Sequence, residues 1–398
     1  MLEVVLHDRA EWREHLLPLV YTRPVSDLRV GILTLSEKWK LRLSTPIYFY
    51  TSPYLQQKFP AAPHSVCYLV IRGNLLPSES LIQVLQGLSS QSVLMKDGQW
   101  IAYKVDHWMD EPDLATFNRI DFTDYLAQVC FLEDIYRLNA VELAADYALL
   151  CAGKTSAQLD DSNRVLGEQL FVGQDVASLC STFNTQSGPI YIGDGAIIEE
   201  GCFLRGPIAI CAGARVKMGS RLYPNVTIGP NATVAGEVNN SVLWGNCAKG
   251  HDGYLGCSVI GEGCNIGAGS SNSNLQNNWS NVSIYDYQEA GFRDTRVPKV
   301  GTFMGDYASC GINSSITTGN IIGVGTQIAM SNIIPKFVAD FCWVTDRKRE
   351  SYRWHKFETM LRDRAAIKKE HLEDLDVQIL HDVYSLTEAQ RQRYLETE

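Results

Sequence analysis

The sequence predicts a mixed fold, with a short α/β unit, then a left-handed parallel β-helix of hexapeptide repeats, then C-terminal helices. Three observations predict it: aliphatic residues recur at every sixth position through the centre, apolar runs alternate with polar stretches before it, and amphipathic segments follow it. We expect the α/β unit over residues 1–115, a helical connector over 116–165, the β-helix over 166–335 and a helical cap over 336–398.

The first part of the chain has the composition of an α/β unit, since short apolar runs are separated by polar segments. The runs expected to form strands are LEVVLHD, TPIYFYT, SVCYLVIRGN and IAYKV. The connector is expected to be helical from Thr116 to Leu150, because FLEDIYRLNAVELAADYALL carries apolar residues at spacings of three and four.

The period of six is the strongest pattern in the chain. Its first frame holds over eight units, at Ile192, Ile198, Leu204, Ile210, Val216, Leu222, Ile228 and Val234. It resumes at Tyr254, Ile260 and Ile266, and after a polar insert over 270–297 a third frame follows at Met304, Cys310, Ile316, Ile322 and Ile328.

A stacked triangular prism explains this period. Each hexad forms one short strand and a turn, three hexads form a coil, and the aliphatic residue points inward so that stacked coils bury an apolar column. Successive coils pair their backbones about 4.8 Å apart. A period of six would place residues on every side of an α-helix, and a β-sandwich would alternate with a period of two.

The last part of the chain is expected to cover the open end of the prism or to pack on a neighbouring subunit. Residues Glu350–His371 form an amphipathic and basic segment. A last helix is expected to open at Ser385, with Glu388 three residues on as a capping box.

Composition excludes several classes of protein. The formal net charge of −10 argues against a general nucleic-acid binder, which would carry a basic face. No apolar stretch of about 18 residues and no signal peptide is recognisable, so we expect no membrane contact. The 11 cysteines are scattered singly, which favours reduced thiols in the cytoplasm.

The interruption after Val234 is where chemistry is expected. It brings Lys249, His251 and Tyr254 into a region where regular coils need no exposed loop. An imidazole suits a general base because its unperturbed pKa is about 6.5. Cys247 with His251 suggests a metal pair, but a third ligand is missing, so no metal is expected there.

The segment KGHDGYLGCSVIGEGCNIGAGSSNSN resembles the acetyltransferase part of bifunctional N-acetylglucosamine-1-phosphate uridyltransferases. That family has a Lys-x-x-His-x-x-Tyr-x-Gly stretch, then an Asn-Ile-Gly-Ala-Gly coil and an Asn-rich loop. Here the matching residues are His251, Tyr254 and Gly256, then the coil 265–269, with Asn274 opening the loop. One departure is that Lys249 stands two residues before the histidine, where the family has three.

The resemblance implies a role for each matched position. His251 would be the general base that takes a proton from a hexosamine phosphate amine as that amine attacks the acetyl thioester. Tyr254 and Asn265 would hold the sugar, and Lys249 and Lys299 would lie near it. Backbone at Ala268 and the loop of Asn274 would face coenzyme A. The phosphate-gripping arginine has no unique match; the local sequence favours Arg205, and Arg221 is the alternative.

The first domain resembles a shortened sugar-phosphate nucleotidyltransferase. Residues 18–24, PLVYTRP, follow the second half of that family's phosphate motif, but the Gly-rich loop is absent and Val25 replaces the family's lysine. Asn74 stands where the family has the Asp that holds Mg²⁺, and a neutral amide is a poorer ligand for that ion. The candidate nucleotide contacts are Arg23, Arg29 and Asn74, and solvated charge is the alternative for the two arginines.

The segment 22–39 also resembles a variant, uridyltransferase-like family of sugar nucleotidyltransferases with this same domain order. We therefore expect an acetyl-CoA-dependent N-acetyltransferase whose β-helix acts on an amino-sugar 1-phosphate or nucleotide amino sugar and whose N-terminal unit binds the sugar nucleotide. A homotrimer is expected by analogy with β-helix acyltransferases. One alternative is a sugar-1-phosphate nucleotidyltransferase that uses Mg²⁺ and has a structural β-helix. The other is a non-catalytic scaffold that binds nucleotide sugars.

Overall fold

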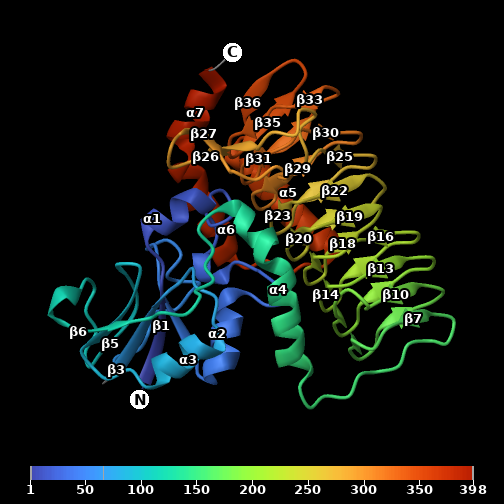
Figure 1. Ribbon diagram of the computed structural model, residues 1–398. Coiled ribbons are helices and arrows are strands. Elements are labelled where there is room, and N and C mark those ends of the chain that lie inside the picture. The colour runs from blue at the N-terminus through green and yellow to red at the C-terminus, as the bar shows by residue number, and fades with distance from the viewer. Residues whose placement is uncertain (1, 66, 397–398) are drawn as a thin grey trace. The chain divides into compact units, whose positions relative to one another are not determined.

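The computed structural model describes residues 2–65 and 67–396 and divides into two compact units (Figure 1). The N-terminal unit comprises residues 1–16, 22–28 and 33–131. The β-helix unit comprises residues 132–398 together with the short segments 17–21 and 29–32. The predicted fold class, an α/β unit followed by a left-handed parallel β-helix and C-terminal helices, is confirmed.

The N-terminal unit is built on one six-stranded sheet of order β2-β1-β3-β5-β4-β6. Its strands are β1 (Leu2–His7), β2 (Ile47–Tyr50), β3 (Cys67–Arg72), β4 (Ser92–Lys96), β5 (Gln99–Val105) and β6 (Asn118–Asp121). Strand β1 pairs in parallel with β2 and β3, whereas β5 runs antiparallel to β3 and β4. All four predicted apolar runs are strands of this sheet.

Helices of the N-terminal unit are short, and apolar clusters lie on both faces of the sheet. The helices are α1 (Ala10–Arg13), α2 (Leu35–Leu43) and α3 (Glu79–Gln86), and the 3₁₀ turns are η1 (Glu14–Leu16), η2 (Val25–Asp27) and η3 (Leu114–Thr116). Thr34 and Glu37 close a capping box at the start of α2.

The sheet extends past the expected boundary at residue 115. Residues Asn118–Asp121 form β6, which pairs in parallel with β4, so the N-terminal unit reaches residue 131. The helix expected from Thr116 therefore begins only at Leu132, as α4 (Leu132–Cys151). The residues that were expected to form the first turns of this helix instead complete the edge of the sheet.

The β-helix has three faces, which we call A, B and C in chain order. Face A contains β7 (Arg164–Leu166), β10 (Thr182–Asn184), β13 (Phe203–Arg205), β16 (Arg221–Leu222), β19 (Glu237–Asn239) and β22 (Tyr254–Gly256). It continues as β25 (Ser271–Asn272), β30 (Ser315–Ile316) and β33 (Ile333–Ile334). At the junction the Asn272 side chain replaces backbone pairing, since its amide accepts from Gly256 N and donates to Gly256 O.

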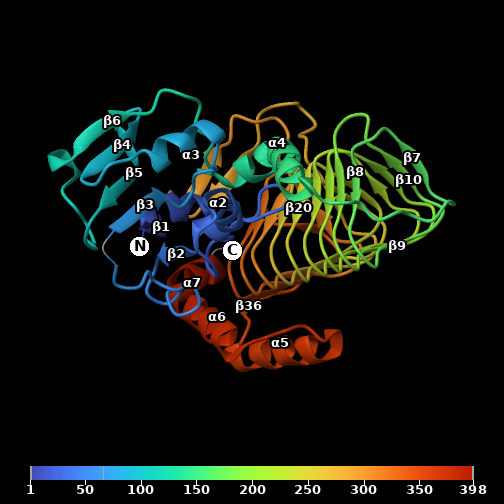
Figure 2. The same cartoon turned by 90° about the horizontal axis from the view of Figure 1, so that it is seen from below.

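Faces B and C are continuous parallel sheets (Figure 2). Face B contains β8 (Leu170–Val172), β11 (Ile190–Ile192), β14 (Ile208–Ile210), β17 (Val226–Ile228), β20 (Ser241–Leu243), β23 (Val259–Ile260), β28 (Thr302–Met304), β31 (Asn320–Ile322) and β34 (Phe337–Val338). Face C contains β9 (Ala177–Ser178), β12 (Ile197–Ile198), β15 (Arg215–Val216), β18 (Thr233–Val234), β21 (Ala248–Lys249), β24 (Asn265–Ile266), β29 (Ser309–Cys310), β32 (Gln327–Ala329), β35 (Cys342–Thr345) and, antiparallel, β36 (Arg349–Ser351).

The predicted inward positions form the core of the prism with one exception. All eight residues of the first frame and all five of the third are buried. In the second frame Ile260 and Ile266 are buried, but Leu255 points inward where Tyr254 was expected. The register shifts by one residue in this coil, and because neighbouring residues of a strand face opposite sides, the Tyr254 ring is turned outward.

The polar insert is an ordered hairpin. Strands β26 (Ser283–Asp286) and β27 (Gly291–Asp294) pair antiparallel. Arg293 on β27 donates two hydrogen bonds of 2.9 Å to the carboxylate of Glu133 on α4. Helix α4 lies against face B, where its Asn139 accepts a hydrogen bond from Thr227.

The C-terminal helices are α5 (Trp354–Lys368), α6 (Asp374–Leu386) and α7 (Glu388–Glu396). The expected cap boundary at residue 335 falls inside the prism, because β34, β35 and β36 follow it. Ser385 does not open the last helix. It lies in the final turn of α6, where its hydroxyl donates to the carbonyl of His381, and Thr387 separates α6 from α7.

Candidate functional site

His251 lies at the corner where face C passes into face A, between β21 and β22. Its side chain is exposed. Ala268 occupies the same corner on the next coil, between β24 and β25, and the two coils are joined there by a hydrogen bond from Gly269 N to Asp252 O. The structure thus places His251 and the expected coenzyme A contact on one edge of the prism, which we call the His251 edge.

Lys249 lies inside the prism. It is only 2% exposed, and its ammonium donates hydrogen bonds to the backbone oxygens of His251 (2.7 Å) and Ala235 (3.1 Å). Burial lowers its pKa to about 8. The family's lysine stands three residues before the histidine, and a shift of one position along a strand turns a side chain to the other face. Lys249 therefore supports the turn of His251 from within and does not reach a surface ligand.

Tyr254 and Asn274 are brought together beside this edge. The Asn274 amide donates a hydrogen bond of 3.1 Å to the Tyr254 hydroxyl. A side chain at Gly256 would overlap that hydroxyl, so the glycine lets the Tyr254 ring lie close to its own backbone. The Tyr-x-Gly spacing seen in the sequence has this local steric cause.

The other expected sugar contacts are more dispersed. Asn265 is exposed on face C, in register with Ala248 of the coil that carries His251. Lys299 is exposed on the return from the insert, and its carbonyl accepts a hydrogen bond from the Tyr136 hydroxyl. Neither side chain has a contact to His251 among the described interactions.

Arg205 is exposed on face A, three strands away from Tyr254 along the order β13-β16-β19-β22. At about 4.8 Å per strand the separation is about 14 Å. Arg221 is one strand nearer and forms an ion pair with Glu237. A shallow cavity of about 360 Å³ lies over this part of face A, lined by Leu166, Thr182, Asn184, Phe203, Leu204, Arg205, Arg221, Leu222 and Tyr223.

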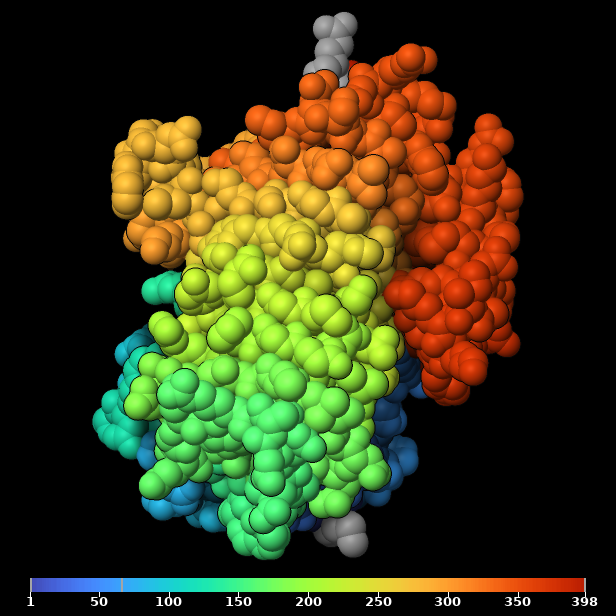
Figure 3. All heavy atoms as spheres, turned by 90° about the vertical axis from the view of Figure 1, so that its right-hand side faces the viewer, coloured from blue at the N-terminus to red at the C-terminus, as the bar shows by residue number. Residues whose placement is uncertain are grey.

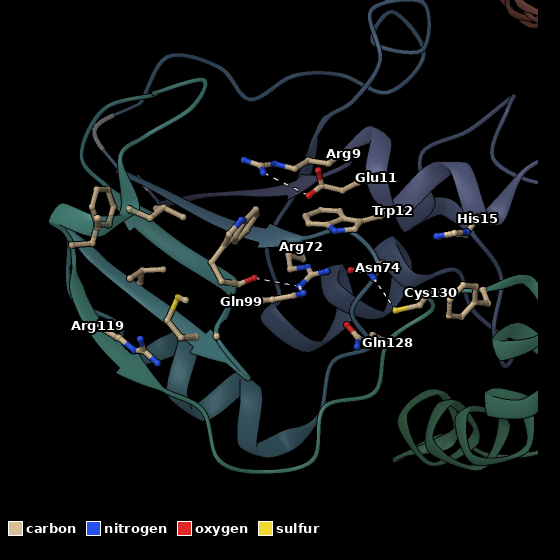
Figure 4. A pocket seen from close by; sticks show the side chains of 18 residues that line it. Arg9, Glu11, Trp12, His15, Arg72, Asn74, Gln99, Arg119, Gln128 and Cys130 are labelled. Carbon is tan, nitrogen blue, oxygen red and sulfur yellow. Dashed lines mark hydrogen bonds and ion pairs between the residues drawn. The ribbon is translucent and has the colours of Figure 1, made fainter. Parts of the chain in front are cut away.

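A larger pocket, which we call the Arg72 pocket, lies in the N-terminal unit at the carboxyl ends of the parallel strands β1 and β3 (Figure 4). Its volume is about 920 Å³. Ligands of α/β sheets commonly bind at this end of the strands. Its polar and aromatic lining comprises Arg9, Glu11, Trp12, His15, Arg72, Asn74, Gln99, Trp100, Phe117, Arg119, Gln128, Cys130 and Phe131.

Sequence reasoning identified only Asn74 among these residues. The side chain of Asn74 is fully buried and donates to the carbonyl of Val129. Arg23 and Arg29 do not line the pocket. Arg23 is half-buried next to Thr22, and Arg29 donates to the carbonyl of Ile32 in the β-helix unit.

The Arg72 pocket does not fit a magnesium ion. Mg²⁺ prefers carboxylate oxygens, and Glu11 is the one carboxylate that lines the pocket, where it forms an ion pair with Arg9. Among the described residues, no group of three or more His, Cys, Asp or Glu side chains could hold a metal ion. The Mg²⁺ that the nucleotidyltransferase alternative would require does not fit the residues of this pocket.

The structure also bears on membrane contact and on the cysteines. In the residues that are described, no helix has both the length and the apolar character needed to cross a membrane. Cys202 and Cys264 lie in the apolar column of the prism, where burial raises the pKa of both thiols. These thiols act as small apolar core residues.

Comparisons with known proteins match parts of the chain. The family model described as "Sugar nucleotidyl transferase" matches residues 4–155. A bifunctional protein GlmU from Methanocaldococcus jannaschii is 30% identical over 117 residues, which are 29% of this chain and 28% of that protein. The GlmU of a Cyanothece species is 25% identical over 264 residues, or 60% and 52% of the two chains. The chain thus spans about half or less of the length of these relatives.

Among solved structures, the polysialic-acid-specific acetyltransferase NeuO aligns at 16% identity with a TM-score of 0.29, covering 48% of this chain and 86% of that one. A likeness this low adds nothing to the fold that the three sheets themselves establish. The sequence matches are more informative than this structural likeness. Residues 4–155, which are less than half of the chain, match the sugar nucleotidyl transferase family model, and a parallel β-helix follows in the sequence.

Proposed function

We propose that the chain is a transferase of nucleotide-sugar metabolism. Its β-helix would transfer an acyl group, acetyl from acetyl-CoA, to the amine of an amino-sugar phosphate or nucleotide amino sugar. The observation that supports this best is the His251 edge, where an exposed imidazole, the expected coenzyme A contact at Ala268 and the Tyr254–Asn274 pair lie on adjoining coils.

The chemistry proposed for His251 is that of a general base. Its imidazole removes a proton from the sugar amine as the nitrogen attacks the thioester carbon, and a new C–N bond forms. The C–S bond then breaks, and the protonated imidazole returns the proton to the departing thiolate. In the described residues no hydrogen bond engages the His251 ring, so both ring nitrogens are available for this exchange.

Tyr254, Asn265 and Asn274 are proposed to position the substrates. The Tyr254 hydroxyl accepts a hydrogen bond from Asn274, which leaves its own proton available to a sugar hydroxyl. Asn265 presents an exposed amide one coil from Ala248. Arg205 or Arg221 could reach a sugar phosphate at this edge only from a neighbouring subunit, because each stands two or more strands away within one chain.

We propose a homotrimer for this reason and because large apolar side chains are exposed on the side of the prism that faces the viewer in Figure 3. Large apolar side chains are exposed on face A and its corner with face C: Val165, Leu179, Phe203, Met218, Tyr223, Ile312 and Ile333. Exposed apolar residues that gather on one side of a molecule can mark an interaction surface. A neighbouring copy on this side would cover these apolar residues and enclose the His251 edge. The reducing cytoplasm is the proposed location, because it suits the buried thiols.

The test is acetyl-CoA turnover over a panel of amino-sugar phosphates and nucleotide amino sugars. Wild type, His251→Ala and His355→Ala are compared, because His355 is an exposed histidine on α5, away from the edge. Loss of a general base lowers the rate about 10²- to 10⁴-fold, so we expect that loss in His251→Ala and normal rates in the control. Equal turnover in wild type and His251→Ala would defeat the assignment.

A further inference from the structure

We propose that the Arg72 pocket is a metal-independent binding site for a phosphate ester. Arg72 would contact the phosphate directly, and the sugar or base of the ligand would pack on Trp12 and Trp100. This site is separate from the acyl-transfer site proposed above and does not depend on it. It follows from the charges, contacts and unmet hydrogen bonds of the pocket.

Arg72 is a buried cation without an acidic partner. It is 5% exposed, and its guanidinium donates to Gln99 Oε1 at 2.8 Å. In the part of the chain that the structure describes, no carboxylate lies within ion-pair distance of it, and its Nε is buried without a hydrogen bond. A buried charge that lacks a counter-charge is costly, so the site favours an anion that would supply one.

Arg13 of the same unit shows the difference. It is buried to a similar degree, 7% exposed, but it forms an ion pair with Asp8 and a hydrogen bond with the Tyr54 hydroxyl. That arginine has its charge balanced within the protein. Of these two buried arginines, Arg72 is the one whose charge would be balanced by a ligand, and it lies at the wall of a cavity.

Aromatic rings give the pocket its apolar wall. The rings of Trp12 and Trp100 lie 5.7 Å apart at 58°, and the guanidinium of Arg72 is 4.3 Å from the centre of the Trp12 ring. Arg9 lies over the Trp100 ring at 5.5 Å. Indole faces next to guanidinium groups suit a ligand that joins a flat or saccharide ring to a phosphate.

Asn74 supplies a second unmet polar group. Its Nδ2 is engaged with Val129, but its Oδ1 is buried with no hydrogen bond. Buried polar atoms are normally satisfied, so an orphaned acceptor on a cavity wall points to a donor brought by a ligand, such as a hydroxyl. The pocket thus offers a cation for phosphate and an acceptor for a sugar or ribose hydroxyl.

Direct contact by arginine distinguishes this pocket from a magnesium-dependent one. A divalent cation here would face Arg9 and Arg72, with Glu11 as the single lining carboxylate. We therefore expect the affinity for a phosphate ester to be the same with Mg²⁺ and with EDTA. Nucleotidyl transfer at this site, which requires the metal in the resembled family, is expected to be absent.

The experiment is calorimetric titration of the full chain with three probes: a UDP-sugar, an amino-sugar 1-phosphate and inorganic pyrophosphate, each with Mg²⁺ and with EDTA. The probes distinguish a nucleotide sugar from a sugar phosphate and from phosphate alone. Arg72→Gln is compared with Arg42→Gln, an arginine of the same unit outside the pocket. Loss of a charge-assisted hydrogen bond weakens binding about 10- to 100-fold, which we expect only for Arg72→Gln.

The stability of the ligand-free variant separates loss of binding from misfolding. Arg72→Gln removes an unbalanced buried charge, so its melting temperature without ligand should equal or exceed that of wild type while the shift with ligand is lost. As a second reporter, tryptophan fluorescence should change on titration of wild type, and Trp12→Phe should reduce that change. His251→Ala should bind in the pocket as wild type does, which keeps this test independent of acyl transfer.

Five outcomes would overturn the proposal. Three are binding that needs Mg²⁺, full affinity in a folded Arg72→Gln variant, and release of pyrophosphate from a nucleoside triphosphate and a sugar 1-phosphate. The other two are binding of pyrophosphate alone and no binding of any probe by wild type. Metal-independent binding of the UDP-sugar or the amino-sugar 1-phosphate that depends on Arg72 supports it.

Discussion

The buried ammonium of Lys249 donates a hydrogen bond of 2.7 Å to the backbone oxygen of His251. A second hydrogen bond holds the same ammonium to Ala235 of the preceding coil. An internal cation therefore fixes the turn that presents the imidazole at the surface. This arrangement separates the residue that positions the turn from the residue that is proposed to react.

Lys249→Met should uncouple stability from activity. Burial lowers the pKa of Lys249 from 10.5 to about 8, so wild type gains stability above pH 10.5 and loses it as the pH falls through 8. That shift corresponds to about 3 kcal/mol of unfolding free energy. Wild type should lose this amount as the pH falls from 10.5 to 8, whereas the methionine variant, which has no titrating group at this position, should not. Acyl transfer should fall at the same time because the turn of His251 is no longer held. Urea unfolding at pH 7, 8, 9 and about 10.5, with turnover at pH 7, measures both; parallel pH curves for the two proteins would contradict the account.

Gly256→Ala should displace Tyr254. A methyl group at this position overlaps the Tyr254 hydroxyl, so the ring must move and its hydrogen bond with Asn274 breaks. Overpacking of this kind costs about 1–3 kcal/mol of stability. Gly311→Ala is the matched control, since a methyl group there meets only ordinary contacts. We expect a raised KM for the amino sugar in Gly256→Ala alone, and unchanged kinetics would show that Tyr254 does not hold the substrate.

Phe203→Asp should dissociate the proposed trimer. The ring is 60% exposed on face A, and a carboxylate there would be desolvated against a neighbouring copy. Tyr125→Asp changes a ring of the N-terminal unit that is 78% exposed and should leave the mass of the assembly unchanged. Light scattering after gel filtration measures the assembly. A wild-type protein that elutes as a monomer would remove the basis of the trimer.

Asp340 should make stability depend on pH near 6. Burial raises the pKa of this carboxyl to about 6, so the neutral form is favoured in the folded chain. The contribution of Asp340 to the stability of the fold is fully present below the pKa of the unfolded chain, about 4, and is lost as the pH rises through 6. Asp340→Asn should flatten the stability curve between pH 4 and 7, whereas Asp175→Asn, at an exposed turn, should leave it unchanged. Thermal melts across this range decide; equal slopes in wild type and Asp340→Asn would refute the prediction.

The prism was predictable because its cause is local and repeated. Every sixth residue enters the same apolar column, so the sequence carries one signal many times, and Ile192 and Ile328 are buried alike. The prediction slipped at Tyr254, where the coil of His251 changes its register. A single irregular coil offers no repeat against which to correct the frame.

The Arg72 pocket was not predictable in this way. Its residues come from segments far apart in the chain: Trp12 follows β1, Arg72 ends β3 and Trp100 lies on β5. Each is ordinary in its own segment, and only strand pairing brings them together. Of this group the sequence pointed to Asn74 alone, through a resemblance. The inward direction of Lys249 was likewise hidden, since it depends on a one-residue offset.

Strand β36 reverses direction and pairs antiparallel with β35 at the end of face C. A parallel sheet that stopped at β35 would offer its backbone groups to the first coil of another molecule, and prisms could then polymerise head to tail into a fibre. The reversed strand occupies those groups, and its charged Arg349 and Glu350 are exposed. The reversed strand therefore ends the parallel sheet and limits the length of the solenoid.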